Sequence, residues 1–411
     1  MSWITLRLRV TTPLFNGHDD EPLRVSSLRG AMRYWFRALA GTKVGPSIRT
    51  LRRLEDEVFG STTNPSPVRM RLGKLPQTRR NPCLSFLDST RFPDQLRKEP
   101  AIGYLMGQGL GTIVKGRYQI TRPYVFPDHK YFELKMALSE DSRINALTLA
   151  SLWMVCAYGG VGSRVRRGFG KIRIIGATLH DQKSVTPWTE SSLQTPGLTH
   201  YKELDDRQRL QPIGPLDDCL EPIDDLLKQI GAPDEARPWR DDEIPTYPVF
   251  SSKWTCAGLS AYSASSWAEL LAHVGRQYRL SRATADNSAS RTNYWPKVKT
   301  PERDAVLHGN SNRFPLGALG LPVVYSKDKV TVGERRASPL WMHPVMEDGE
   351  WRLFSFAFHN TFLPAETEVR LSGKIRKSVI ITDDDVVNRT SDWIQRMRHD
   401  PAPYRLPGEE G

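Results

Sequence analysis

The sequence predicts an α+β protein with antiparallel sheets, built of two domains. Its 411 residues are enough for two domains of ordinary size, each with its own core. In the first 180 residues, segments with the two-residue period of a strand alternate with segments that have the period of a helix. Strand-like and helix-like segments return, in a looser order, after an acidic middle segment. We therefore place domains at residues 1–180 and 244–411, joined by residues 181–243.

The first domain opens with WITLRLRVTTP, residues 3–13, in which every second side chain is apolar, as in a half-buried strand. The segment SSLRGAMRYWFRALAG, residues 26–41, carries an apolar stripe of helical period. We expect Ser26 or Ser27 to cap this helix and Gly41 to end it. The other predicted elements are strands at 67–75 and 131–138, a buried helix at about 144–158 and a strand at 171–179. The order β-α-β-β-α-β is the split βαβ pattern of a ferredoxin-like domain.

The rest of the chain divides into an acidic piece and a second domain. Residues 181–243 are rich in Pro, Asp and Glu, which predicts a linker or a surface insertion. The second domain is expected to be a diverged copy of the first, ending in a C-terminal helix. Its predicted elements are strands at 246–254, 338–345 and 351–359, a turn leading into a strand at 315–325, and helices at 265–283 and 385–399.

The charge of the chain predicts a polyanionic partner. The formal net charge is +12, and residues 1–180 alone carry +16, so the basic surface belongs to the first domain. The four cysteines lie far apart without a zinc-binding spacing, which favours a cytoplasmic protein with reduced thiols. The most apolar segment, INALTLASLWMVCAYGGVG, contains polar residues and ends in glycines, so it predicts a buried helix and not a membrane span. No metal or cofactor is expected.

Three arginines line one face of the first predicted helix. Arg29, Arg33 and Arg37 follow each other at intervals of four residues, so their charges repel one another along the helix. This spacing is a poor way to stabilise an isolated helix. We therefore expect an anion against this face.

The stretch GGVGSRVRRGFGK, residues 159–171, combines glycines with Arg164, Arg166, Arg167 and Lys171. Glycine permits positive φ and close backbone approach, while the cationic groups form charge-assisted bonds to phosphate. A nucleotide-binding Walker loop lies between a strand and a following helix, whereas this stretch follows a helix and precedes a strand. A flexible basic turn without a ligand is a second alternative. The pattern favours contact with an extended nucleic-acid backbone.

Two weaker candidate sites remain. Arg335 and Arg336 in GERRASPL contact phosphate or belong to a plain solvated hairpin, and the sequence does not separate these alternatives. His18 in NGHDDEP is the only weak candidate for a catalytic group, because it has two carboxylates beside it in a polar loop. Solvated surface is the more frequent role of such a loop.

Three of these stretches together resemble the RAMP superfamily of CRISPR proteins, in particular the first subunit of the type III-B (Cmr) RNA-guided effector complex. They are VTTPLFNGHDDEPLRVSSLRGAMRYWFRALAG, EVFGS and GGVGSRVRRGFGKI, and ALGLPVVY and ERRASPLWMHPV resemble the second half of the same family. The resemblance covers roughly residues 5–175 and 310–345. At NGHDD the sequence departs from the turn that the family leads us to expect, which leaves the role of His18 open.

The resemblance implies two ferredoxin-like (RRM-like) domains and a subunit that holds RNA without cleaving it, near the 3′ end of the guide RNA and beside other RAMP subunits. Guide RNA and target RNA are the implied nucleic-acid partners. Carried over by motif, RNA contacts fall on the first helix and the glycine-rich loop, at Ser26, Ser27, Arg29, Arg33, Arg37, Gly162, Arg164, Arg166, Arg167 and Lys171.

The alternative function is that of an enzyme, a metal-independent RAMP endoribonuclease that processes guide precursors with His18 as general acid or base. A basic protein of another ferredoxin-like family is the remaining alternative.

Overall fold

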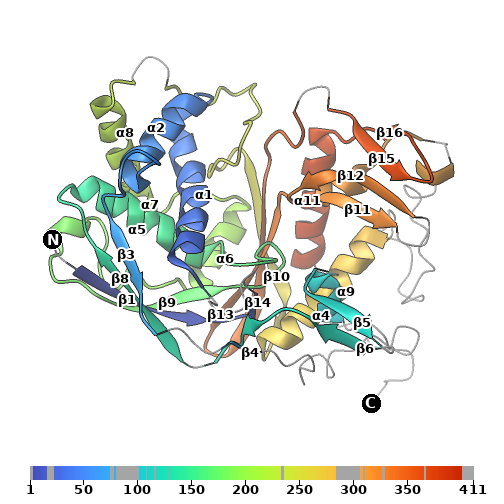
Figure 1. Ribbon diagram of the computed structural model, residues 1–411, viewed down its shortest axis with the longest axis horizontal. Coiled ribbons are helices and arrows are strands. Elements are labelled where there is room, and N and C mark those ends of the chain that lie inside the picture. The colour runs from blue at the N-terminus through green and yellow to red at the C-terminus, as the bar shows by residue number, and fades with distance from the viewer. Residues whose placement is uncertain are drawn as a thin grey trace.

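A computed structural model gives the fold of the chain. It describes residues 3–15, 23–74, 78–79, 101–107, 109–114, 117–128, 130–232, 236–283, 306–308, 311–325, 329–364 and 367–399. Two large apolar clusters form the interior. One lies mainly in the first half of the chain and the other mainly in the second half (Figure 1).

The first half is a sheet with helices on one face (Figure 1). Strands β1 (Trp3–Val10), β3 (Arg69–Leu72), β8 (Tyr131–Ala137) and β9 (Ile172–Thr178) form an antiparallel sheet of order β3-β8-β1-β9. Helices α1 (Val25–Val44), α2 (Ile48–Phe59) and α5 (Ser142–Ala157) cover one face, onto which β1 directs Ile4, Leu6 and Leu8. The main elements therefore follow the chain order expected from the sequence, and the side chains that alternate with this apolar set, among them Arg7 and Lys135, point to the opposite face of the sheet.

Helix α1 differs from its prediction at both ends. It begins at Val25 after Arg24, and no side chain among the described residues caps it, so Ser26 and Ser27 lie in its first turn. Gly41 does not end the helix, which continues to Val44. The Tyr247 ring packs so closely on Gly41 that an added Cβ would lie 2.7 Å from it, so this glycine serves packing inside the helix.

A long insertion separates β3 from β8. Its elements are β4 (Thr78–Arg79), α4 (Ala101–Met106), β5 (Gly111–Val114), β6 (Arg117–Ile120) and β7 (Tyr124–Val125). Strand β7 pairs with β4 and with β2 (Leu14–Phe15), while β5 pairs with β6. Helix α4 packs on helix α9 of the second half, so the insertion links the two halves of the molecule.

Residues 181–243 contain η2 (Lys183–Val185), α6 (Leu198–Arg207), α7 (Pro215–Asp218) and α8 (Leu220–Gln229). Their apolar side chains, including Tyr201 and Leu226, are buried in the first cluster, and the Tyr201 hydroxyl donates to the Ala157 carbonyl at 2.7 Å. Acidic side chains such as Asp217 and Asp218 remain exposed. The acidic residues thus lie on the outer surface of helices whose apolar side chains pack on the first core.

The described part of the second half contains two sheets and two long helices. Strands β10 (Thr255–Ala264), β14 (Glu350–Phe358) and β13 (Leu340–Glu347) form one antiparallel sheet in the order β10-β14-β13. The other sheet has the order β11-β12-β15-β16, from β11 (Leu321–Tyr325), β12 (Val330–Arg336), β15 (Val369–Gly373) and β16 (Ser378–Val379). Helices α9 (Trp267–Ala283) and α11 (Asp383–Arg398) and the 3-10 turn η3 (Pro315–Leu319) pack on these sheets.

The strand predicted at residues 246–254 is wrong. The chain is irregular there, and the strand begins at Thr255. Val249 and Phe250 are buried, and the Phe250 amide donates to the Ala38 carbonyl of α1 at 2.8 Å. The apolar residues of this segment anchor an irregular connection on the first half, which gives a pattern similar to that of a strand.

Within the described residues, no helix is both long enough and apolar enough to cross a membrane.

Candidate nucleic-acid interface

The glycine-rich loop, residues 159–171, joins α5 to β9 and is held by backbone hydrogen bonds. The Ser163 amide donates to the Phe15 carbonyl at 2.7 Å, and the Gly170 amide donates to the Pro13 carbonyl at 2.9 Å. Gly170 has φ +66, and a Cβ there would lie 2.0 Å from the Val161 carbonyl oxygen, so glycine is required. These contacts argue against a flexible turn, because the loop backbone is fixed on both sides.

Two of its arginines hold the halves of the molecule together. Arg166 donates to the Ser338 carbonyl at 2.7 Å, and its guanidinium lies 4.8 Å from the centre of the Trp341 ring. Arg167 lies 5.5 Å from the centre of the Tyr278 ring of α9. Both side chains are half-buried and have intramolecular partners. Their phosphate contacts remain predictions. The structure adds a second role for both arginines, which is to join the two halves of the molecule.

Gly162 and Arg164 form the outer part of the loop. Gly162 is exposed and has φ +88, while the half-exposed Arg164 adopts φ +62. The Arg164 guanidinium lies over Gly107 and Gly109, where added Cβ atoms would come within 3.1 and 3.4 Å of it. The loop therefore presents its backbone at Gly162 and places a cation over the glycines that follow α4.

Lys171 does not reach the surface, which corrects its prediction as a phosphate ligand. Its side chain is buried, and its ammonium group donates to the carbonyl oxygens of Gly159 and Val165, the latter at 2.9 Å. Burial lowers the pKa of Lys171 well below its usual value. The lysine therefore links the two ends of the glycine-rich loop from its inner side. Its hydrogen bonds supply a donor to loop carbonyls that would otherwise lack one.

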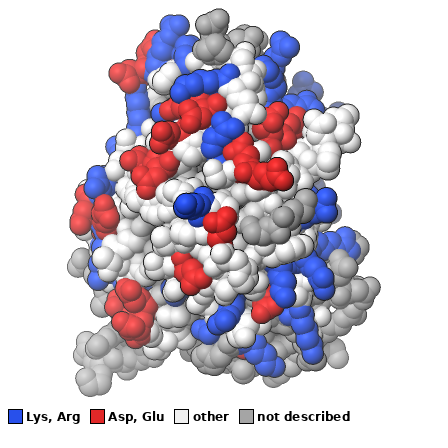
Figure 2. Space-filling view, turned by 90° about the vertical axis from the view of Figure 1, so that its left-hand side faces the viewer, with Lys and Arg blue, Asp and Glu red and all other residues white. Residues whose placement is uncertain are grey.

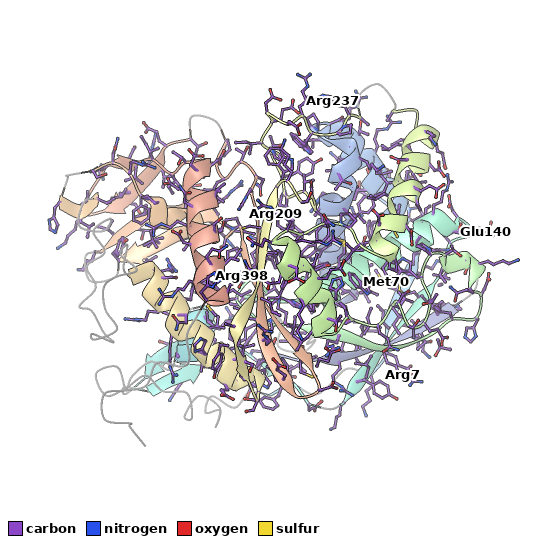
Figure 3. The ribbon with its side chains drawn as sticks, turned by 180° about the vertical axis from the view of Figure 1, so that it is seen from behind. Arg7, Met70, Glu140, Arg209, Arg237 and Arg398 are labelled. Atoms are coloured by element: carbon purple, nitrogen blue, oxygen red, sulfur yellow. The ribbon has the colours of Figure 1, made fainter. Side chains whose placement is uncertain are left out.

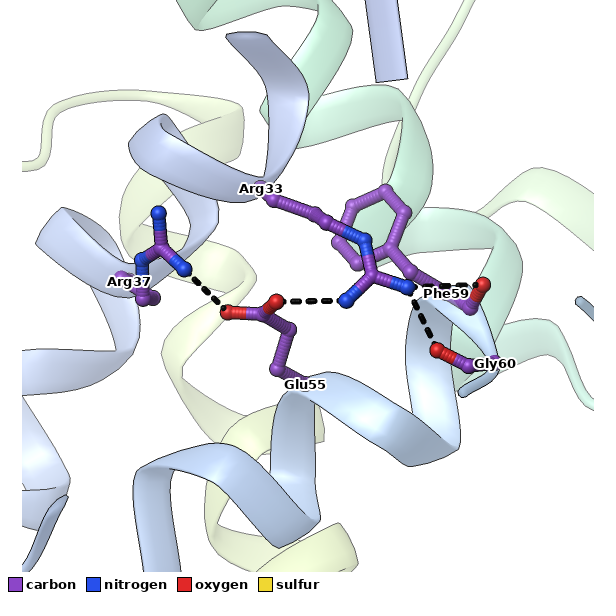
Figure 4. A network of polar contacts seen from close by, with 5 residues as sticks. All are labelled: Arg33, Arg37, Glu55, Phe59 and Gly60. Atoms are coloured by element: carbon purple, nitrogen blue, oxygen red, sulfur yellow. Dashed lines mark hydrogen bonds and ion pairs between the residues drawn. The ribbon is translucent and has the colours of Figure 1, made fainter. Parts of the chain in front are cut away.

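The chain itself supplies the anion expected against the arginines of α1 (Figure 4). Glu55 of α2 accepts from Arg33 at 2.6 Å and from Arg37 at 3.1 Å. Arg33 also donates to the carbonyls of Phe59 and Gly60 at the end of α2, where the helix dipole favours a cation. The repulsion along α1 is thus relieved by a neighbouring helix, and the arginine spacing by itself does not require an external anion.

Arg29 is different from the two arginines that follow it. Its side chain is half-buried, and no ion pair joins it to any residue that the structure describes. Burial, followed by the charge of Arg33, lowers the pKa of Arg29 from its usual value. An anion bound to a guanidinium that is half-buried next to another cation would be stabilised by charge-assisted hydrogen bonds.

Gly30, which is not among the predicted site residues, lies inside α1 and is exposed. An added Cβ at Gly30 would meet no atom within 4 Å. Glycine in a helix interior costs roughly 0.5–1 kcal/mol relative to alanine, so the fold gains nothing from it here. Ser26, Ser27, Arg29 and Gly30 together form an open surface that we call the α1 strip. The signal for it was present in the sequence, as a lone glycine within a strong helical pattern.

The remaining predicted site residues are divided between exposed and structural roles. Arg336 donates to the Thr361 carbonyl at 3.2 Å, whereas Arg335 is exposed at the end of β12. His18 lies outside the described residues. Within the described ranges, no three His, Cys, Asp or Glu side chains gather as a metal site would require.

Comparison with known proteins agrees with this arrangement. The family model described as the RAMP superfamily matches residues 7–173, which include the second half of β1, all of β3, β8 and α1, and the whole glycine-rich loop. The CRISPR system Cmr subunit Cmr1-2 of Pyrococcus furiosus is 32% identical over 176 residues, which are 41% of this chain and 92% of that protein. The chain belongs to the RAMP superfamily, in its Cmr1 family.

Two further comparisons extend this assignment. The CRISPR system Cmr subunit Cmr1-1 of the same organism is 33% identical over 156 residues, which are 38% of this Cmr1-family chain and 41% of that relative, so the match spans less than half of its length. The crystal structure of Cmr1 from Pyrococcus furiosus in its apo form matches with a TM-score of 0.52 and 21% identity, over 95% of this chain and 97% of that one. The structural match supports a shared mixed fold of helices and antiparallel sheets along the whole chain.

Proposed function

We propose that this Cmr1-family chain is a non-catalytic, RNA-binding subunit of a type III-B CRISPR effector complex in the cytoplasm. It holds the backbone of guide or target RNA near the 3′ end of the guide, beside other RAMP subunits. We further propose that each half is a ferredoxin-like domain. The sheet order β3-β8-β1-β9 supports this for the first half, while the second, diverged half keeps three strands and two helices of that pattern.

The observation that carries the proposal is the α1 strip. Within the described residues no side chain caps the start of helix α1, and the first amide groups of a helix are donors that suit a phosphate. Ser26 and Ser27 add hydroxyl groups there, and Arg29 adds a cation that pairs with no carboxylate of the described residues. Gly30 lets a backbone approach the helix closely. This combination of donors, charge and open space suits a polyanionic strand.

The segments on either side of the α1 strip are held in place by contacts within the chain, which supports the same role. One turn beyond Gly30, Arg33 fixes the end of α2 to α1. On the other side, Arg166 of the glycine-rich loop lies 5.7 Å from the Tyr34 ring centre. Because both neighbours are fixed, the strip is preorganised, and a ligand would not have to order it on binding.

A matched pair of variants tests the RNA contact. Arg29→Gln removes a cation from the α1 strip, whereas Arg52→Gln removes one from the exposed side of α2. Binding of a labelled single-stranded RNA is measured by fluorescence anisotropy over a series of salt concentrations. We expect Arg29→Gln to weaken binding and to reduce the slope of log K against log salt by about 0.7, the value for one phosphate on a single strand. Equal affinities for the two variants would refute the assignment of the strip.

Co-purification tests the proposed assembly. The full chain is expressed with a tag alongside the other RAMP subunits and a guide RNA of the same system. The proposal expects both RNA and neighbouring subunits to be recovered with it. Recovery of the chain alone would instead favour a basic protein of another ferredoxin-like family.

An RNA cleavage assay tests the non-catalytic part of the proposal. Two of the other histidines already have partners within the fold, since His200 contacts the Tyr158 hydroxyl at 2.8 Å and His359 contacts Cys256 at 3.2 Å. His18, which has two carboxylates beside it in the sequence, is the residue to test. The purified chain is incubated with repeat RNA in EDTA. Specific cleavage that disappears in His18→Ala would replace our proposal with an endoribonuclease.

A further inference from the structure

The first sheet has a second face, opposite to α1, that no helix of the described residues covers. Alternation along the strands directs Arg7 and Arg9 of β1, Lys135 of β8, and Arg69 and Arg71 of β3 to this side. Glu133 is the only carboxylate that β1, β3 and β8 place there. Figure 2 views this end of the molecule, where Lys and Arg lie along the top and gather again toward the lower right, a region with few Asp and Glu.

Among the residues that the structure describes, most of the basic side chains on this face have no partner of opposite charge. Lys135 lies 3.6 Å from Glu133, but within the described residues no carboxylate forms an ion pair with Arg7, Arg69 or Arg71. Arg71 stands directly opposite Lys135 in the register of β3 and β8. Like charges directly opposite each other destabilise a sheet, so the fold alone does not account for this arrangement.

Two large aromatic side chains are exposed on the same face. Trp3 is 44% exposed and Tyr131 is 51% exposed. The register pairs Trp3 with Ala137 and Arg9 with Tyr131, so the two rings lie near opposite ends of the paired strands, roughly 20 Å apart at the usual strand rise. Between them, the Arg7 guanidinium lies 5.8 Å from the centre of the Tyr131 ring. In Figure 3, Arg7 lies at the lower edge of the molecule, away from the helices.

We propose that this outer face of the first sheet, defined by Trp3, Arg7, Arg9, Arg69, Arg71, Tyr131 and Lys135, binds single-stranded nucleic acid. The arginines and the lysine neutralise phosphates, and the two rings offer surfaces on which bases stack. An excess of cations next to exposed rings favours a strand with both charge and aromatic bases over an acidic protein surface. The sheet separates this face from the α1 strip, so the proposal does not rest on the proposed function.

Two variants separate the contributions of charge and stacking. Arg7→Gln/Arg71→Gln removes two cations, and Trp3→Ala/Tyr131→Ala removes both rings. Arg49→Gln/Arg52→Gln, on the exposed side of α2, is the matched control for charge. The probes are labelled twelve-nucleotide oligo-U RNA and oligo-dT DNA, titrated by anisotropy against the full chain at several salt concentrations.

We expect the charge variant to weaken binding and to lower the salt slope by about 1.4, for two phosphates of a single strand. The aromatic variant is expected to weaken binding roughly tenfold for each ring that stacks, at an unchanged salt slope. The control should lose less affinity than the charge variant. All four side chains are exposed, so thermal unfolding should show folded variants, with Arg7→Gln/Arg71→Gln at least as stable as the parent because repulsion is relieved.

Three outcomes would overturn the proposal. One is parental affinity in both variants, and another is an equal effect of the charge variant and its control. The third is loss of binding to an acidic RAMP subunit with no change for either oligonucleotide, which would make the face a protein interface. Comparison of the RNA and DNA probes shows which nucleic acid the face prefers. Loss of binding in Trp3→Ala/Tyr131→Ala, with Arg29→Gln unaffected, would support this face while refuting the α1 strip.

Discussion

Replacement of Gly30 by alanine should separate stability from function. Gly30 lies in the interior of α1, is exposed, and has no atom within 4 Å of the position of an added Cβ. The new methyl group therefore meets no clash in the folded chain. Alanine removes the entropic penalty of glycine in a helix, so the free energy of unfolding should rise by about 0.5–1 kcal/mol.

The same methyl group should weaken RNA binding. If a phosphate backbone lies on α1 at Gly30, a Cβ there acts like an extra group in a well-packed interface, which typically costs about 1–3 kcal/mol. This corresponds to an affinity loss of roughly 5- to 150-fold. Gly30→Ser supplies a graded control, since serine is larger than alanine but a poorer helix former. It should bind RNA more weakly than Gly30→Ala and gain less stability.

Urea unfolding and anisotropy with single-stranded RNA measure the two effects. Urea is preferable to heating, because about 1 kcal/mol shifts the melting temperature of a cooperative unit of 411 residues by only about 1 °C. A stabilised Gly30→Ala that binds RNA as tightly as the parent would refute the reasoning, since nothing would then approach the helix at this point. A destabilised Gly30→Ala would show that the surface is not open.

Three other predictions concern groups whose roles the structure redefines. Lys171→Met should lower the free energy of unfolding by about 1–3 kcal/mol, because it leaves buried carbonyls without a donor. Its salt slope for RNA binding should stay unchanged, and a reduced slope would restore Lys171 as a phosphate ligand. Glu55→Gln should lower the free energy of unfolding in urea by about 1–3 kcal/mol, because Arg33 and Arg37 lose their charged partner. For the same reason this variant should bind RNA more tightly and with a steeper salt dependence. Weaker binding would show that Glu55 positions these arginines for RNA. Burial lowers the pKa of His200 and of His359 to about 4, so both are neutral in the fold while the unfolded chain takes up protons below its pKa of about 6.5. The free energy of unfolding should therefore fall as the pH is lowered from about 6.5 to 4, by about 3 kcal/mol for each histidine, and a flat urea-unfolding profile over that range would contradict their buried positions.

Much of the first half could be predicted from the sequence, because its elements carry strong local periods. The alternation in β1 and the apolar stripe of α1 are visible within a few residues, and their order along the chain sufficed to predict the antiparallel sheet. The glycine-rich loop was likewise visible as a local composition. The pattern at residues 246–254 failed for the converse reason, since Val249 and Phe250 are buried by residues far away in sequence.

The sequence alone could not show which of the Lys and Arg side chains are available to contact a ligand. Composition and spacing determined that the first half is basic and where its arginines stand along the helix and the loop. Only the tertiary structure brings Glu55 to Arg33 and Arg37, buries Lys171 against loop carbonyls and leaves Arg29 beside an open Gly30. The physical reason is that the partners of a charged group lie on separate segments, whose approach is decided by packing and not by any pattern within one segment.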